Sequence, residues 1–198
     1  MTSLPRTRIL VLSGVGLAMA AGAIATPAIA ASWQRPPYDV SRFPLPADDP
    51  HLAAGPGSSV TFAWEGWNGS NWLIRVRTRG PRGGFTPTVT VSPVGANHED
   101  PRLAIAPDGT TNVVWKNMAT WNRRVQIRTR RPGKRFGRVQ TLSSGRADAT
   151  QDRVATGPSG QTAVAWAFGQ GNRRALQFRE RPAGSGSFEP VQTLSPYG

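Results

Sequence analysis

A repeat of 51 residues constrains this chain more than any other feature of its sequence. Trp64, Trp115 and Trp166 stand 51 residues apart. A proline precedes each tryptophan at a constant interval, and two arginines follow it at constant intervals. Each copy closes on a threonine, an apolar residue and a serine, as at 90–92. A fixed period of this size is typical of architectures in which neighbouring units cover one another's apolar faces.

Each copy contains four short segments with strand composition, separated by turns. In the middle copy we expect a first strand at 102–106, followed by a Pro-Asp-Gly turn. The second strand, 111–116, is apolar on both faces, which predicts cover on both sides. The third, 124–128, alternates and predicts a half-buried strand. Beyond Ala30 we find no segment with the period of a helix.

This organisation predicts an all-β fold, a β-propeller-type array of three four-stranded antiparallel blades. The predicted blades are 50–99, 100–150 and 151–198. A β-sandwich is the alternative, although its strands are not expected to repeat at this spacing. Propellers usually need about 4 to 8 blades. We therefore expect an incomplete or half propeller: two chains join into a six-bladed ring, a partner completes it, or the sequence is part of a longer array.

The segment 1–30 has the features of a signal peptide. Two arginines precede the uncharged run 9–25, and Ala28-Ile29-Ala30 fits the pattern that signal peptidase accepts. A retained membrane anchor is the alternative. We expect cleavage near Ala30, secretion from the cell and no stable membrane span afterwards. The segment 31–49 contains four prolines, which disfavour a helix, and is predicted to form an extended leader.

Composition excludes several kinds of site. The chain has no cysteine, which rules out disulfides, zinc–cysteine centres and thiol catalysis. His51 and His98 are the only histidines, too few for most histidine-based centres. Lys and Arg together number 24 against 11 Asp and Glu, for a formal net charge of +13. A strongly basic exported protein favours acidic ligands. We predict no metal or cofactor, and no nucleic-acid module is visible.

Several motifs of the repeats match those of a known family. They are the P-D-G turn at 107–109, the V-x-W strand at 113–115, the V-Q-x-R-x-R strand at 125–130 and the V-Q-T-L-S segment at 139–143. With them, the stretch 50–195 resembles the repeat arrays of secreted bacterial β-propeller proteins of the sialidase-like superfamily. Sialidase blades carry an Asp-box of the form S-x-D-x-G-x-T-W. Only the segment 107–110 comes near that form here, so the box is degenerate.

We recognise no catalytic site in the repeats. A sialidase mechanism, which the resemblance would imply, needs a tyrosine nucleophile, but Tyr38 and Tyr197 both lie outside the repeat strands. We expect the acidic residues of the repeats to lie at turns or strand ends, solvated and unpaired. These acidic residues are Glu65, Glu99, Asp100, Asp108, Asp148, Asp152, Glu180 and Glu189.

Two groups of residues are candidates for ligand binding. Arginines recur on one face of the third strand, where they would either bind polyanions or simply solubilise the strand. They are Arg77, Arg79, Arg128, Arg130, Arg179 and Arg181. Aromatic rings stand between the second and third strands beside Asn and Gly, where they would either stack on sugar rings or pack on an adjacent blade. They are Trp67, Trp72 and Trp121.

Together these patterns predict a secreted, non-catalytic binding or scaffold protein with propeller-type blades. Its candidate ligand is a carbohydrate or an acidic cell-surface polymer, and a second copy that completes a six-bladed ring is its candidate partner. A sialidase-like glycoside hydrolase, degenerate or truncated, is the alternative function.

Overall fold

The structure is a computed structural model that describes residues 37–41 and 44–195. The predicted signal peptide and most of the predicted leader lie outside these residues. The chain divides into two units between Pro37 and Tyr38, and the fold described below belongs to the second unit. In the part of the chain that the structure describes, no helix is long and apolar enough to cross a membrane.

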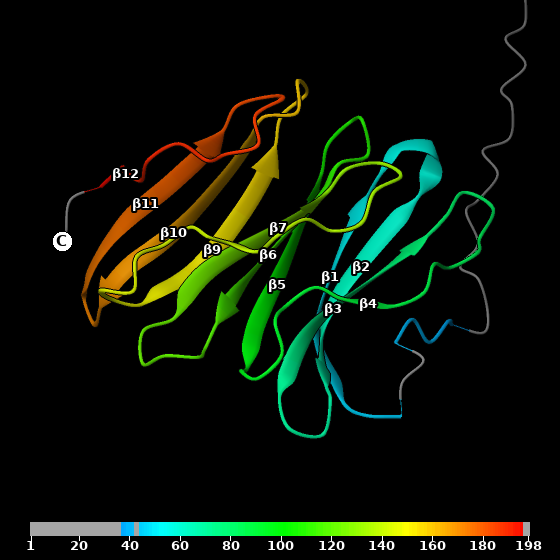
Figure 1. The fold of residues 1–198 in the computed structure, drawn as a ribbon, viewed down its shortest axis with the longest axis horizontal. Helices are drawn as coiled ribbons and strands as arrows, with labels where there is room; N and C mark the ends of the chain where they lie inside the picture. Colours follow the sequence, from blue (N-terminus) through cyan, green and yellow to red (C-terminus); the bar gives the residue numbers. More distant parts are fainter. Residues whose placement is uncertain (1–36, 42–43, 196–198) are drawn as a thin grey trace, which may run out of the picture. The chain divides into compact units, whose positions relative to one another are not determined.

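The second unit consists of three four-stranded antiparallel sheets, in each of which the strands pair in chain order (Figure 1). The first sheet contains β1 (Ala47–Ala54), β2 (Val60–Trp67), β3 (Trp72–Arg79) and β4 (Val89–Thr90). The second sheet contains β5 (His98–Ile105), β6 (Thr111–Asn117), β7 (Arg124–Arg130) and β8 (Gln140–Thr141). The third sheet contains β9 (Ala149–Thr156), β10 (Thr162–Gln170), β11 (Arg173–Arg181) and β12 (Gln192–Thr193).

The sequence period is also a structural period. Strands β2, β6 and β10 begin at Val60, Thr111 and Thr162, which stand one sequence repeat apart. A short 3-10 turn, η1 (Pro56–Ser58), joins the first two strands. For the residues that the structure describes, the prediction of an all-β fold with three four-stranded antiparallel sheets is confirmed, and none of these sheets closes into a barrel.

The first strand of the second sheet is longer than its sequence predicted, because a bulge interrupts its apolar pattern. Strand β5 begins at His98 and not at Arg102. Its register with β6 shifts between Glu99 and Arg102, and Asp100 there has a φ of +53°. Asp49 and Gln151, one repeat to either side, also have positive φ. A residue in the left-handed region bends the strand and re-aims its side chains.

Two clusters of apolar side chains hold adjacent sheets together. Between the first and second sheets lie Ala63, Ile74, Val76, Val91, Leu103, Val113 and Trp115. Between the second and third lie Val114, Val125, Ile127, Leu142, Ala149, Val164, Trp166, Phe168 and Phe188. Strand β6 supplies both clusters, Val113 and Trp115 to one and Val114 to the other. Its predicted burial on both faces is confirmed.

The first strands of the three sheets are neighbours. Strand β1 contacts β5, and β5 contacts β9. The short fourth strands lie at the opposite edge of each sheet. The bulges at Asp49, Asp100 and Gln151 therefore belong to neighbouring strands, which brings charged side chains of different sheets together.

Candidate functional site

Arg181 belongs to a buried polar network between the second and third sheets. Its guanidinium donates hydrogen bonds to Asn112 Oδ1 and to Thr129 Oγ1, both at 2.8 Å. Asn112 in turn donates to Thr162 Oγ1 on β10 at 3.2 Å. Burial lowers the pKa of Arg181 from its ordinary value, although an arginine remains charged at neutral pH. The network satisfies polar groups that would otherwise be costly to bury.

The equivalent arginines make similar contacts one sheet earlier. Arg130 donates to Thr78 Oγ1 of the first sheet at 3.3 Å, and burial lowers its pKa as well. The Arg79 guanidinium lies 5.9 Å from the centre of the Tyr38 ring. Each of these side chains therefore contacts the element that precedes its own sheet.

The other three arginines bind backbone carbonyls. Arg77, Arg128 and Arg179 each donate through Nε to the loop that follows their strand. Arg128 also donates through Nη1 to the carbonyl of Val91 in the preceding sheet, at 2.9 Å. Arg77 donates in the same way to the carbonyl of Val40, also at 2.9 Å.

The third strand of the second sheet, β7, is half-buried and alternates as predicted, whereas the third strand of the first sheet, β3, is more buried than an alternating strand. Arg75, Arg77 and Arg181 are buried, because the following loop and the preceding element cover the face that carries them. A role for the six predicted arginines in ligand binding stays a prediction, but these internal contacts give them a structural role.

The three candidate tryptophans lie at the second hairpin of the first sheet and at the equivalent hairpin of the second sheet. The Trp67 and Trp72 rings face each other across the β2–β3 hairpin with centroids 5.6 Å apart, and both are half-buried. Trp121, between β6 and β7, is fully exposed. The structure thus brings two of the three together, and leaves Trp121 as the ring most available for stacking.

A cavity of about 520 Å³ opens between the loops of the second and third sheets; we call it the basic cleft. Its lining includes the exposed cations Arg131, Lys134 and Arg135 from the loop between β7 and β8, together with Arg181. The carboxylate Asp108 also lines it and accepts hydrogen bonds from the backbone and hydroxyl of Thr110. The lining therefore carries four cations against one carboxylate.

The cations of the cleft loop form no ion pair with any residue that the structure describes. In the described part of the chain, every ion pair involves Arg102, Lys116 or Arg123. The sequence analysis did not select this loop as a site. The signal was present, since the segment 131–135 consists of three cations around a Pro-Gly turn.

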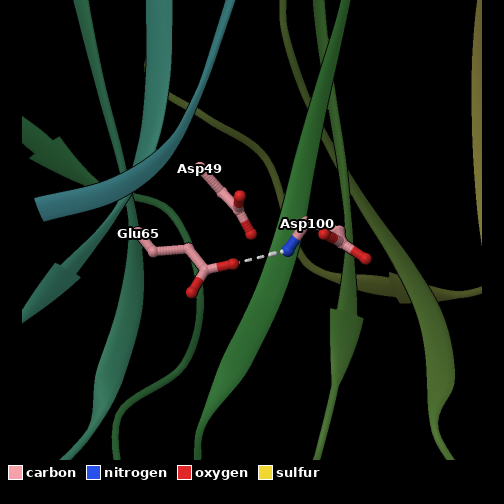
Figure 2. Close-up of side chains that lie close together, drawn as sticks. All are labelled: Asp49, Glu65 and Asp100. Carbon is pink, nitrogen blue, oxygen red and sulfur yellow. Dashed lines mark hydrogen bonds between the residues drawn. The ribbon is translucent and has the colours of Figure 1, made fainter.

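A second charged group lies where β1, β2 and β5 meet (Figure 2). Asp49, Glu65 and Asp100 each place one carboxylate oxygen within 4.8 Å of the others. The backbone N–H of Asp100 donates to Glu65 Oε1 at 2.7 Å, and the Asp100 carboxylate pairs with Lys116. The prediction of unpaired acidic residues is therefore wrong here, because the bulges place the Asp49 carboxylate and the Asp100 N–H beside Glu65, and the Asp100 carboxylate beside Lys116.

The electrostatics of these carboxylates diverge. Burial, with a hydrogen bond and charge repulsion from Asp49, raises the pKa of Glu65 from 4.5 to about 7, against the lowering effect of the Asp100 N–H. Burial also acts to raise the pKa of Asp100, but its bond to Lys116 and the nearby charge of Arg102 outweigh it and lower that pKa. Glu65 can thus hold a proton near neutral pH while Asp100 stays ionised. A cation at this group would compete with Lys116 for Asp100.

Asp152 is another acidic residue that the sequence placed in solvent and the structure buries. It lies within β9, and neither carboxylate oxygen has a hydrogen-bond partner on another described residue. Burial raises its pKa from 3.8 to about 6, although Arg102 and Lys116 of the second sheet act to lower it. The adjacent sheet desolvates this carboxylate, so the prediction of a solvated turn residue is wrong.

A scan of protein-family models finds none that matches this chain. A search of curated proteins finds no match either.

Proposed function

We propose that this chain is a secreted, non-catalytic binding protein with propeller-type blades, and that it binds an acidic polymer in the basic cleft. The lining of that cleft carries the proposal. Arg131, Lys134 and Arg135 are exposed there, have no ion pair in the described part of the chain, and lie beside Arg181. A concentration of like charge over a recess attracts polyanions and is only partly screened by physiological salt.

The arrangement of the sheets supports the propeller-type assignment. Each four-stranded sheet runs from a first strand next to its neighbours to a short fourth strand at the far edge. The sheets recur with the period of the sequence, and their apolar faces are in contact. Propeller blades have this order of strands and this face-to-face packing. The signal-peptide features of the segment 1–30 support secretion.

The proposal is tested by using calorimetry to measure how tightly the protein binds polygalacturonate, a carboxylated polysaccharide. Replacing Arg131, Lys134 and Arg135 together by serine is expected to weaken binding at least tenfold and to reduce its dependence on salt. The matched control replaces Arg146, Arg173 and Arg174, three arginines outside the cleft lining, and removes the same total charge. Equal losses in the two variants would show that net charge and not the cleft binds the polymer, and would overturn the proposal.

One observation favours a glycoside hydrolase as a second candidate function. Glu65 and Asp100 form a pair of carboxylates whose pKa values are moved apart, which is the pattern of a general acid beside an ionised partner. Neither Glu65 nor Asp100 lines the basic cleft, which is why binding is the first choice. Turnover of a fluorogenic sialoside that Glu65→Gln abolishes would establish the hydrolase instead.

A further inference from the structure

Among the residues that the structure describes, the first and third sheets each leave one apolar face without a neighbouring sheet. Leu103 on β5 is 5% exposed against the first sheet, whereas Leu52, at the same repeat position on β1, is 62% exposed. Val125 on β7 is fully buried against the third sheet, whereas Leu176, its equivalent on β11, is 42% exposed. These two repeat positions are therefore covered where a sheet lies against them and exposed where none does.

The two bare faces are complementary because they are equivalent to faces that already pack against each other within the chain. Leu176 lies on the face of the third sheet that, in the first and second sheets, packs against the sheet that follows in the chain. Leu52 lies on the face of the first sheet that, in the second and third sheets, packs against the sheet that precedes in the chain. This pairing already occurs twice within the chain. A third instance requires only a third sheet against a first sheet, which a second copy of this chain provides.

The short stretch 38–41, which we call the leader segment, already stands where part of a preceding sheet would lie. Val40 accepts a hydrogen bond from Arg77 as Val91 accepts one from Arg128, both at 2.9 Å. Val40 and Val91 are one repeat apart, as are Arg77 and Arg128. The leader segment thus lies against the first sheet in the same way that the residues directly after β4 lie against the second sheet.

Space for the remaining strands of that preceding sheet lies beside the leader segment. A cavity of about 380 Å³ is lined by Val40, Leu52, Phe62 and Trp64 among others, nearly all of its surface apolar. In the second sheet the residues equivalent to the last three are Leu103, Val113 and Trp115, and a neighbouring sheet covers all of them. Apolar surface of this kind is stabilised by burial.

We propose that strands β9, β10 and β11 of a second copy dock on the first sheet, with the leader segment taking the place of that copy's β12 beside its β11. This replacement of β12 by the leader segment follows from the repeat. Leu194, which follows β12, holds the repeat position of Val91, and Val40 already occupies that position against Arg77. Only one of the two can lie there. Strand β12 pairs with β11 at only two positions, and Leu194 is 59% exposed, so β12 is the element displaced.

Two identical contacts related by a twofold axis then close six sheets into one ring. A head-to-tail contact either closes in this way or extends into a fibre. Six sheets fall within the range of about 4 to 8 blades in which propellers close. This inference concerns assembly and is independent of the ligand proposed above.

Cysteine cross-linking tests the exchange directly, since the chain has no cysteine of its own. Gln177 on β11 pairs with Thr193 on β12, and the neighbouring backbone bond from Leu194 to Leu176 makes that pair a non-hydrogen-bonded one, suited to a disulfide. Asp39 holds the repeat position of Thr90, which is equivalent to Thr193. Oxidation of the Asp39→Cys, Gln177→Cys full chain should give a covalent dimer. A product that remains monomeric would overturn the exchange.

The reverse experiment locks β12 in place. Oxidised Gln177→Cys, Thr193→Cys chain should be a monomer by light scattering and should return to a dimer on reduction. A dimer that persists in the oxidised form would refute displacement of β12.

A surface variant tests the docking face itself. Leu176→Arg places a charge on the bare face of the third sheet and should halve the mass in solution. Val94→Arg is the matched control, because Val94 is 77% exposed in the loop between the first and second sheets and lies on neither bare face. A wild-type chain that is monomeric at micromolar concentration, or loss of the dimer in both variants alike, would overturn the proposal.

Discussion

Replacing Asp152 by asparagine should stabilise the protein, and by an amount that grows with pH. Burial raises the pKa of this carboxyl from 3.8 to about 6. Between these values the unfolded chain ionises Asp152 while the folded chain keeps it protonated, so stability falls as pH rises. Below the lower value both states are protonated and no penalty exists. Above the higher value the penalty is complete, about 3 kcal/mol at about 1.4 kcal/mol per tenfold change in proton affinity.

The assay is urea denaturation followed by tryptophan fluorescence at several pH values. Asp152→Asn should gain about 1 kcal/mol at about pH 4.5 and about 3 kcal/mol at about pH 8 relative to the parent chain. The other titrating groups are the same in the variant and the parent chain, so their contributions cancel when the two free energies of unfolding are subtracted. Glu189→Gln, which removes a carboxylate from an exposed loop residue, serves as control and should show no such trend. A gain that does not change with pH, or a loss under alkaline conditions, would refute the burial of an unpaired Asp152.

The remaining predictions concern packing and the backbone. Leu103→Ala should lower the free energy of unfolding by about 2–5 kcal/mol, because it opens a cavity between sheets. Leu52→Ala should lower it by less than about 1 kcal/mol in the dilute monomer. Equal losses in the two variants would contradict the stacking of the sheets. Gly169→Ala should destabilise by about 2 kcal/mol or more, since φ is +140° and a Cβ would clash with the backbone oxygen of Arg173. Gly186→Ala, where nothing lies within 4 Å, should be nearly neutral in the same denaturation assay. Arg181→Met should cost about 1–3 kcal/mol, because the buried Asn112 Oδ1 loses one of its two donors and keeps only the Thr129 hydroxyl. An unchanged denaturation midpoint would contradict a stabilising role for that network.

The period in the sequence was sufficient to predict the number of sheets and the position of their central strands. Trp115 and Trp166 mark β6 and β10, and the apolar residues on both sides of Trp115 correctly indicated a strand covered on both faces. These features follow from a pattern within each repeat. They need no knowledge of which side chain of one sheet meets which side chain of the next.

The features that the sequence did not predict depend on contacts between sheets. Glu65 and Asp152 resemble ordinary strand-end acids, and only the adjacent sheet removes them from water. Arg77 and Arg181 occupy polar positions of an alternating strand, yet the element before their own sheet covers them. Likewise, the positive φ of Asp100 reflects a bulge, which leaves no signature in an apolar–polar pattern.

The leader segment could have been identified from the sequence. Val40 and Ser41 precede Val91 and Ser92 by the same interval that separates the tryptophans. Extending the repeat backward would have placed them against the first sheet. The four prolines of the predicted leader, 31–49, instead suggested a segment that does not belong to the repeat.

A crystal structure of the full chain would test most directly the claim that its sheets are stacking units with complementary bare faces. The account predicts six sheets from two copies around a common axis, with Leu52 buried by β10 and β11 of the second copy and Val40 beside that β11. A single copy whose first sheet stays bare, or two copies joined through any other surface, would contradict it.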